Sequence, residues 1–309
     1  MAKFGHIDKR LTDISIQYNQ SEFVGQELFP EMPVKKGSDK YLVYAKGNQF
    51  QQVDDNLSKN SQANEVQMAF SDETYSVKDY GLKGYVTPED IANADDPLQP
   101  EADEVEVLTS TILLKREIRA KAVCDGMSTN TASPSTKWTF SAGTPVTDIE
   151  AGANAMFRRP NIMIVSRPVW DKMKFNADII AKIGGGFTGL KVATTDMVAQ
   201  LFGLEKVIVA DSKKDANIQP QSASLSYVWG KSVVLAYVDK RNSKKIVTFG
   251  RLFSQKLTAN GGMGRTFQVR TWEDPSTGLG GRKVIQVEHA SVEKLISEDF
   301  GYHLTDCIA

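Results

Sequence analysis

The chain has 309 residues, of which 41% are hydrophobic and 24% are charged, and its formal net charge is −1. This length is enough for two domains, or for one large domain with a sizeable core. The near-neutral charge excludes a globally basic surface of the kind that drives nonspecific nucleic-acid binding. The two cysteines, Cys124 and Cys307, argue against a disulfide-stapled secreted fold.

The N-terminal sequence MAKFGHIDKR lacks the apolar core of a secretory signal. No run in the chain approaches the ~18 apolar residues of a membrane span. We therefore expect a protein that is made in a reducing cytoplasm and has no membrane partner.

Residues 1–34 are predicted to form an extended arm. Pro30 and Pro33 prevent a regular helix and favour extended backbone. The apolar residues Phe23 and Phe29 have few apolar neighbours in sequence with which to form a core. We expect them to pack on another surface, and an N-terminal edge strand of the main fold is the alternative.

Residues 35–83 are predicted to form an extended loop shaped as a protruding hairpin. Tyr41–Tyr44 and Val66–Phe70 have strand patterns, and the polar residues between them include almost no core formers. Long loops without a core of their own are uncommon in compact domains and usually have a function.

The stretch Asp95–Cys124 is predicted to form one long helix, with Pro97 at its first position, after a short helix that starts at Thr87. A helix of about 28 residues spans roughly 42 Å, which is long for a compact domain. It is either an ordinary core helix or the spine of a flat, extended subunit. Its predicted apolar stripe consists of Leu98, Ala102, Val105, Leu108, Ile112, Leu113, Ile118 and Ala122.

Residues 151–260 are predicted to form a small mixed α/β domain. Asn161–Val165 and Val207–Ala210 are apolar runs typical of strands that are buried on both faces. Tyr227–Val238 is a third strand region, with a bend expected at Gly230. Helices are predicted at 148–157, 168–173 and 194–202.

Residues 261–309 return to a strand pattern. Phe267–Trp272 and Lys283–Glu288 both alternate, and the turn residues between them predict a hairpin. A short helix is predicted at Val292–Ile296.

The sequence predicts no catalytic, cofactor-binding or metal-binding residue. His6, His289 and His303 lie near the chain ends, and none has a Cys, Asp or Glu at metal-ligand spacing. Cys124 is expected to be a small buried apolar residue of the long helix. Ser166 lacks a nucleophile elbow motif, as does Ser212.

The glycine-rich stretch Gly184–Gly189 is the best candidate for binding a phosphate, yet it follows a predicted helix and lacks a Lys-Ser or Lys-Thr ending. An edge loop of the small domain is favoured. The basic pairs Lys213–Lys214, Lys240–Arg241 and Lys244–Lys245 lack interleaved aromatic residues, so solvated loops are expected there. Contact between these pairs and a polyanion is the alternative.

The order of these parts resembles the major capsid proteins of tailed double-stranded DNA bacteriophages, which have the Hong Kong 97-type fold. The resemblance covers nearly the whole chain and lies in order and spacing. It is carried by Leu28–Val34, Lys35–Tyr80, Gly84–Pro97, Leu98–Cys124, Asn161–Val165, Arg167–Trp170, Val207–Asp211, Tyr227–Val238 and Phe267–Glu288.

The resemblance implies an α+β fold with five parts in chain order. These are an N-terminal arm (1–34), an extended loop (35–83), a peripheral domain (84–150) with a spine helix (97–124), an axial domain (151–260), and the returning strands of the peripheral domain (261–309). It also implies that many copies form hexamers and pentamers, which close into an icosahedral shell around the phage genome.

The resemblance further implies portal and scaffolding partners, a decoration protein in some relatives, nonspecific contact with packaged DNA, assembly in the host cytoplasm, and no cofactor or turnover. Some relatives carry an N-terminal scaffolding segment that is cut off during maturation. We expect this segment to be absent here, and either a separate scaffolding protein or a chain in its mature form would account for its absence. Lys46 and Lys59 lie on the loop, but no crosslink is inferred. An encapsulin-like compartment shell, a ring-forming tail or connector protein, and a phosphate-binding enzyme using Gly184–Gly189 are the alternatives.

Overall fold

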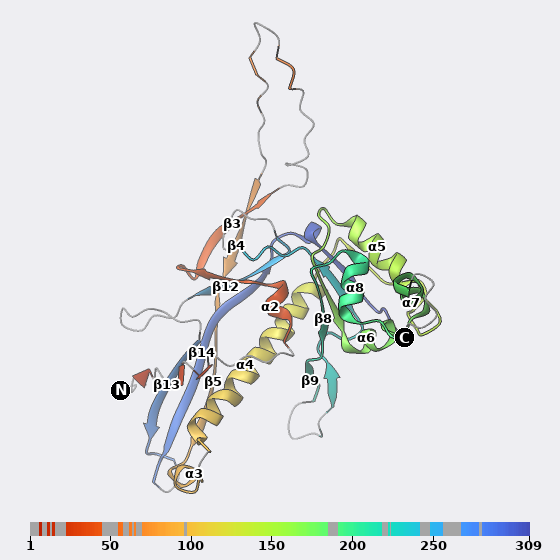
Figure 1. The fold of residues 1–309 in the computed structure, drawn as a ribbon. Coiled ribbons are helices and arrows are strands. Elements are labelled where there is room, and N and C mark those ends of the chain that lie inside the picture. The colour runs from red at the N-terminus through yellow and green to blue at the C-terminus, as the bar shows by residue number, and fades with distance from the viewer. Residues whose placement is uncertain are drawn as a thin grey trace.

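A computed structural model of the chain describes residues 6–7, 11–12, 14–15, 23–44, 55–57, 62–63, 65, 70–95, 98–184, 191–217, 222, 224–241, 248–255, 267–277 and 280–309. Two sheets, each covered by helices, lie at opposite sides of the subunit, and a two-stranded hairpin projects from it (Figure 1). The α+β class expected from the sequence is confirmed.

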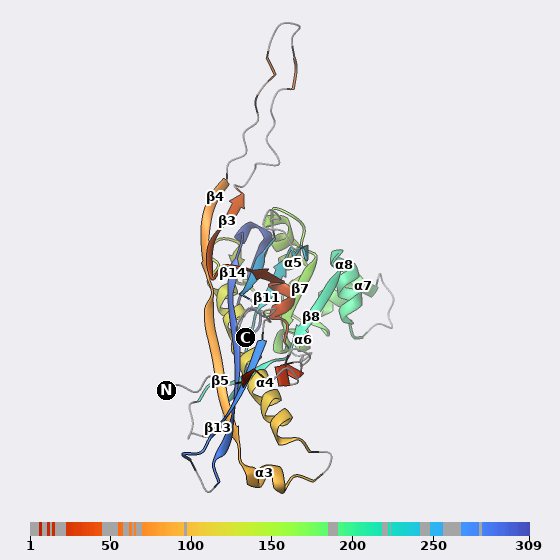
Figure 2. The ribbon, with the colours of Figure 1, turned by 90° about the vertical axis from the view of Figure 1, so that its left-hand side faces the viewer.

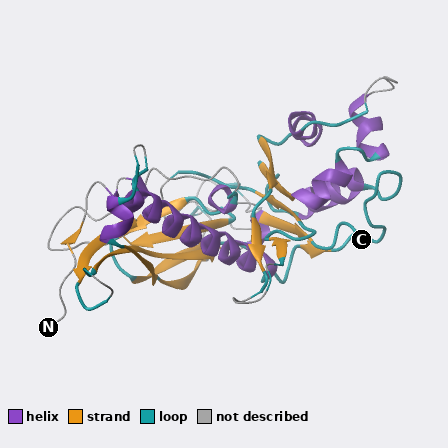
Figure 3. Cartoon of the chain, turned by 90° about the horizontal axis from the view of Figure 1, so that it is seen from below, coloured by secondary structure: helices purple, strands orange, loops and turns teal. Residues whose placement is uncertain are grey.

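A six-stranded sheet and the long helix α4 (Pro100–Asp125) form what we call the six-stranded half. Figure 3 shows α4 lying across one face of this sheet, and the short helix α3 (Pro88–Ala92) precedes it. The strand order is β1-β13-β14-β12-β2, with β5 paired to β14 outside this path. The strands are β1 (His6–Ile7), β2 (Glu31–Val34), β5 (Lys78–Val86), β12 (Gly250–Gln255), β13 (Phe267–Asp274) and β14 (Arg282–Leu295).

The long helix is confirmed, but it begins at Pro100, with Gln99 as the N-cap residue, and not at the expected residue 97. Pro97 itself lies outside the described residues. The N–H groups in the first turn of a helix have no acceptor within the helix, so a proline loses no hydrogen bond there. Pro100 fits this position as well as Pro97 would. The capping box predicted at Thr87 is present at the start of α3.

The apolar stripe of α4 follows the prediction only in its first half. Val105, Leu108, Ile112 and Leu113 are buried as expected. Leu98 precedes the helix and is 64% exposed. In the second half, the buried face consists of Arg116, Glu117, Ala120 and Cys124, in place of Ile118 and Ala122.

A five-stranded sheet with order β6-β15-β11-β7-β8 and four helices form the five-stranded half. Its central strands β7 (Ile162–Ser166) and β11 (Val233–Ala236) are buried at every position, as the continuous apolar run at 161–165 predicts. The other elements are β6 (Thr131–Ala132), β8 (Lys206–Ala210), β15 (Gly301–Leu304), α5 (Pro145–Ala155), α6 (Arg167–Met173), α7 (Ala177–Gly184) and α8 (Thr195–Phe202). A small hairpin, β9 (Lys213–Asp215) with β10 (Leu225–Tyr227), projects from this half, and the bend expected at Gly230 has φ 58°.

The strand positions differ in several places from the division expected from sequence. β12 lies in the six-stranded sheet between β14 and β2, and not in the α/β unit expected at 151–260. β15 pairs with β11 and β6, away from the hairpin strands of 261–309. Strand partners are chosen over long sequence separations, so chain order alone misplaces both segments.

Two further corrections concern residues near these boundaries. β5 runs from 78 to 86 and therefore crosses the expected boundary at 83, because it pairs continuously with β14. Trp138, Val146 and Ile149, expected in the peripheral unit at 84–150, lie in the core of the five-stranded half. Residues 292–295 continue β14 and do not form the expected helix, since the alternating burial of the strand extends through them.

The projecting hairpin consists of β3 (Ser38–Tyr44) and β4 (Phe70–Ser76), and Figure 2 shows it continuing the line of β5 away from both halves. The ring of Tyr75 stacks on Phe253 of β12, with 4.5 Å between the ring centroids, and this contact fixes the hairpin's base. Residues 66–69 of the predicted second strand lie outside the described residues.

The N-terminal segment is attached to the body through α2 (Gly25–Leu28) and β2, which pairs in parallel with β12. Leu28 and Phe29 are fully buried against the body. For residues 31–34 the structure therefore shows an edge strand of the main fold, the second of the two expected alternatives. No helix among the described residues combines the length and apolar character needed to cross a membrane.

Candidate assembly surfaces and the arm junction

The most highly organised polar site joins three distant segments at the Glu117 carboxylate. The backbone N–H of Val24 donates to Oε1 (3.1 Å), and that of Gly25 donates to Oε2 (2.8 Å). The indole Nε1–H of Trp229, in the turn before β11, donates to Oε1 over 2.6 Å. We call Val24, Gly25, Glu117, Ala120 and Trp229 the arm junction.

The arm junction is buried, and this governs its electrostatics. Glu117 is 2% exposed and Trp229 1% exposed. Burial raises the pKa of Glu117, because a carboxylate loses its hydration there. The hydrogen bonds from Trp229, Gly25 and Val24 and the neighbouring Arg116 oppose this shift of the pKa.

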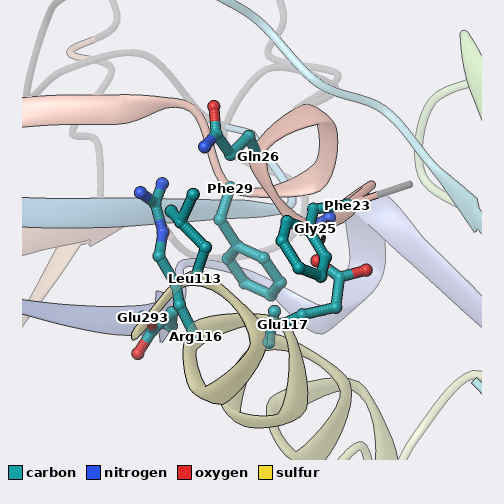
Figure 4. A pocket seen from close by; sticks show the side chains of 9 residues that line it. Phe23, Gly25, Gln26, Phe29, Leu113, Arg116, Glu117 and Glu293 are labelled. Carbon is teal, nitrogen blue, oxygen red and sulfur yellow. Dashed lines mark hydrogen bonds between the residues drawn. The ribbon is translucent and has the colours of Figure 1, made fainter. Parts of the chain in front are cut away.

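The arm fits closely onto α4 at this point. A Cβ atom at Gly25 would lie 2.7 Å from Glu117 Oε2 and 3.0 Å from Ala120 Cβ, so glycine is required by space. Figure 4 shows Glu117 and Arg116 on α4 below Phe23, Gly25 and Phe29. The pocket among them has a volume of about 10 Å³, which is room for about one water molecule and for no larger ligand.

A row of charged side chains continues from the arm junction along α4 and β14. Arg119 Nε donates to Glu293 Oε2 over 3.2 Å, and the Arg119 guanidinium lies 3.9 Å from the centroid of the Tyr80 ring. His289 stacks on Phe267, with 4.7 Å between centroids. Desolvation, with smaller contributions from Arg116 and Arg119, lowers the pKa of His289 to about 3, so this histidine is neutral at pH 7.

The outside of the arm is tied to the five-stranded half by ion pairs. Glu27 accepts from Lys240 Nζ (3.0 Å) and Lys206 Nζ (3.3 Å). Burial raises the pKa of Glu27, but these hydrogen bonds outweigh it and the net shift is downward. Exposed pairs of this kind contribute little stability, about 0–1 kcal/mol each.

Three residues of the basic pairs found in the sequence have partners within the chain. Lys240 is held by Glu27, and Arg241 forms an ion pair with Asp239 at 2.6 Å. Lys213 lies over the ring of Tyr227 at 5.0 Å in the β9–β10 hairpin. Lys244 and Lys245 lie outside the described residues.

Large apolar side chains are exposed on the projecting elements and at the ends of both halves. On β5 and the free face of α4, Tyr85 is 59% and Val107 60% exposed. Leu57 in the extended loop is 60% exposed, and Leu225 on β10 is 68% exposed. The remaining members of this set are Leu82, Ile91, Leu98, Phe140, Phe175 and Val192.

Among the residues considered for chemistry, His303 is hydrogen-bonded to the backbone of Cys124. Cys124 is buried, as predicted, and Cys307 is also a buried free thiol; burial raises the pKa of both, that of Cys307 to about 12. Desolvation lowers the pKa of His303 to about 4. Within the described ranges, no three His, Cys, Asp or Glu side chains are placed to hold a metal ion.

Two further sequence candidates remain without a chemical role. Gly184 is the last residue of α7, and residues 185–190 of the glycine-rich stretch lie outside the described residues. The side chain of His6 is likewise outside them. The hydroxyls of Ser166 and Ser212 are buried.

Sequence reasoning missed the arm junction. The available signal was the helical spacing of Glu117, which lies four residues after Leu113 and three before Ala120 on the buried face of α4. A carboxylate on an apolar stripe requires buried donors, and these come from segments 92 and 112 residues away, at Gly25 and Trp229.

Comparison with curated proteins finds two phage relatives. The chain is 26% identical over 310 aligned residues to the major capsid protein of Pseudomonas phage JBD67, covering 98% of this chain and 97% of the relative. It is also 26% identical over 252 residues to the major capsid protein of Burkholderia phage BcepMu, covering 77% of this chain and 78% of that protein. No protein-family model matches the sequence.

Solved structures share the fold over nearly the whole chain. A phage-related protein from Bordetella bronchiseptica RB50 superimposes with a TM-score of 0.74 at 18% identity, covering 99% of this chain and 98% of that one. The capsid of cyanophage P-SCSP1u has a TM-score of 0.57 at 10% identity, covering 91% and 87%. The SrpI encapsulin of Synechococcus elongatus PCC 7942 has a TM-score of 0.51 at 8% identity, covering 98% and 91%.

These findings confirm the resemblance to phage major capsid proteins with the Hong Kong 97-type fold. The protein is a structural subunit of a capsid shell, it self-assembles, and its place is the virion. The arm junction and the exposed apolar side chains therefore belong to a protein whose work is done by contacts between copies.

Proposed function

We propose that copies of this chain form hexamers and pentamers that close into an icosahedral shell around a double-stranded DNA phage genome. The observation that carries this proposal is the set of surfaces that one copy leaves uncovered, formed by the long edge strand β5 and by several exposed apolar side chains.

The β3–β4 hairpin, the free edge of β5 and the exposed side chains Tyr85, Val107 and Leu225 are surfaces that a neighbouring copy would cover. The net charge of −1 lets copies pack without strong mutual repulsion.

Within this proposal, the six-stranded half acts as the peripheral domain with α4 as its spine, and the five-stranded half acts as the axial domain. The projecting hairpin extends over neighbouring copies. A portal and a scaffolding protein assist assembly in the host cytoplasm, a decoration protein is a further partner, and packaged DNA is contacted nonspecifically. The role requires neither a cofactor nor catalytic turnover.

An encapsulin-like shell is the second candidate, because an encapsulin shares the fold. The phage shell is favoured, since both curated relatives are phage capsid proteins. The cargo separates the two candidates. Nuclease-protected long DNA in purified particles supports a phage shell, whereas a single enclosed protein supports a compartment.

The direct test combines negative-stain electron microscopy with size-exclusion light scattering of the full chain. We expect closed shells tens of nanometres across, or rings of five and six copies. A uniform monomer or dimer would contradict the proposal. In that case, a panel of nucleotides tested for thermal stabilisation would address the phosphate-binding alternative at Gly184–Gly189; a ligand at 100 times its Kd adds about 2.7 kcal/mol.

A further inference from the structure

The Glu117 carboxylate is shared by the arm and the five-stranded half, which otherwise meet through apolar packing and the exposed ion pairs of Glu27. Its Oε1 accepts both the Val24 N–H of the arm and the Trp229 indole N–H of the five-stranded half. Its Oε2 accepts the Gly25 N–H, again from the arm. Glu117 itself belongs to α4, the spine of the six-stranded half.

Burial makes these hydrogen bonds interdependent. A buried carboxylate is tolerated only when donors replace its lost hydration. With all three donors present, the charge is well compensated and the arm can stay closed over it. With one donor fewer, the buried charge is less compensated, and opening the arm, which admits water to the carboxylate, costs less.

The tight packing prevents another side chain from substituting for a lost donor. The pocket beside Glu117 has room for about one water molecule. Gly25 has no space for a side chain, and the Phe29 ring lies so close to Gly250 that a Cβ there would be 2.4 Å from Phe29 Cε1. The arm therefore has one closed position, which requires Glu117 to be held in place.

We propose that Glu117 couples closure of the arm to the placement of the five-stranded half on α4, through the shared hydrogen bonds to Val24, Gly25 and Trp229. The coupling is a property of a single copy and does not depend on the proposed shell. In a shell, a neighbour that drew the arm away would also loosen the contact between α4 and the Trp229 turn.

Trp229→Phe tests the coupling, because it removes the indole donor and keeps an aromatic ring. Trp138→Phe is the matched control: Trp138 is equally buried and donates to Asp148 Oδ2 over 2.7 Å, inside the core of the five-stranded half. Hydrogen exchange of amides 23–34 is followed by mass spectrometry in the full chain.

Trp229→Phe is expected to speed exchange in the arm by about tenfold or more, as the loss of a hydrogen bond to a charged group implies. Trp138→Phe should leave exchange in the arm near the wild-type rate. Equal arm exchange in the two variants would overturn the proposal. Slower arm exchange in Trp229→Phe would also overturn it, because that result means the two donors compete for Oε1.

Gly25→Ala supplies the reverse test and serves alone if Trp229→Phe does not fold. Coupling between two sites is reciprocal, so displacing the arm must loosen the Trp229 turn. We expect faster exchange at residues 225–232 with unchanged exchange in β7. A change confined to residues 23–34 would overturn the proposal.

Discussion

The two sheets of this protein differ in how much of their surface the chain covers by itself. In the five-stranded half, every residue of β7 and β11 is buried between helices and neighbouring segments. In the six-stranded half, Val86 is the one buried residue of the nine in β5, although this strand pairs with β14 along its full length. The centre of the first sheet is enclosed within one copy, whereas the second sheet has a long edge strand, β5, that is mostly exposed.

This difference distinguishes the surfaces that stabilise the fold of one copy from those that are available for contacts between copies. A sheet enclosed on both faces stabilises the subunit, because its apolar side chains are removed from water whatever the neighbours do. A long free strand edge is normally avoided, since it promotes pairing with other chains. In a shell subunit the same edge, together with the projecting hairpin, becomes a contact surface.

The largest effect is expected from a pair of leucines, one buried in the five-stranded sheet and one exposed on the hairpin that projects from the same half. Leu235→Ala in β11 removes a fully buried side chain and should lower the free energy of unfolding by about 2–5 kcal/mol. Leu225→Ala on β10 removes a side chain that is 68% exposed and should change it by less than about 0.5 kcal/mol. Urea unfolding of both variants checks this, and equal losses would mean that the burial contrast does not set stability.

Glu117→Gln tests the junction between the two halves. The substitution keeps the size of the side chain but replaces one accepting carboxylate oxygen by an amide NH₂, which cannot accept from the N–H donors that face it. We therefore expect a loss of about 1.5–3 kcal/mol. Glu106→Gln on the exposed side of the same helix is the control and should have almost no effect. Surface substitutions usually change the free energy of unfolding by less than about 0.5 kcal/mol. A loss this small for Glu117→Gln would show that the hydrogen bonds of Glu117 do not hold the halves together.

His289 makes the free energy of unfolding depend on pH, and we expect this effect to be smaller than that of Glu117→Gln. Its pKa of about 3 in the folded chain is below the usual value of 6.5, so the unfolded chain binds the proton more readily between these values. The contribution of His289 to stability is complete above about pH 6.5 and is lost as the pH falls toward 3. Between pH 7 and pH 5 the loss amounts to about 2 kcal/mol.

His289→Phe should remove this part of the pH dependence and leave the rest of the profile unchanged. The measurement is the difference in unfolding free energy between pH 7 and pH 5 for the wild type and the variant. If both proteins lose the same amount, His289 titrates normally and its burial is of no consequence for acid stability.

The sequence predicted those elements whose signal is local. Ile162–Val165 is apolar without a break, and Thr87 starts a capping box, so both features could be read from adjacent residues. The first half of the α4 stripe also followed from periodicity, since Val105, Leu108 and Ile112 repeat at helical spacing.

The features that the sequence did not predict depend on distant partners. β15 joins β11 and β6, and nothing in residues 301–304 distinguishes that sheet from the other one. The role of Glu117 depends on Gly25 and Trp229, which lie on opposite sides of it in the chain. Hydrogen bonds to a buried charge require geometry that a pattern of residue types does not contain.

Deletion of residues 50–65, the outer part of the extended loop, tests the central claim most directly. The claim is that the enclosed half stabilises the subunit while the projecting hairpin serves neighbouring copies. The account predicts a variant that unfolds in urea like the wild type but no longer forms closed shells in electron micrographs. Normal closed shells from the deleted chain would contradict it.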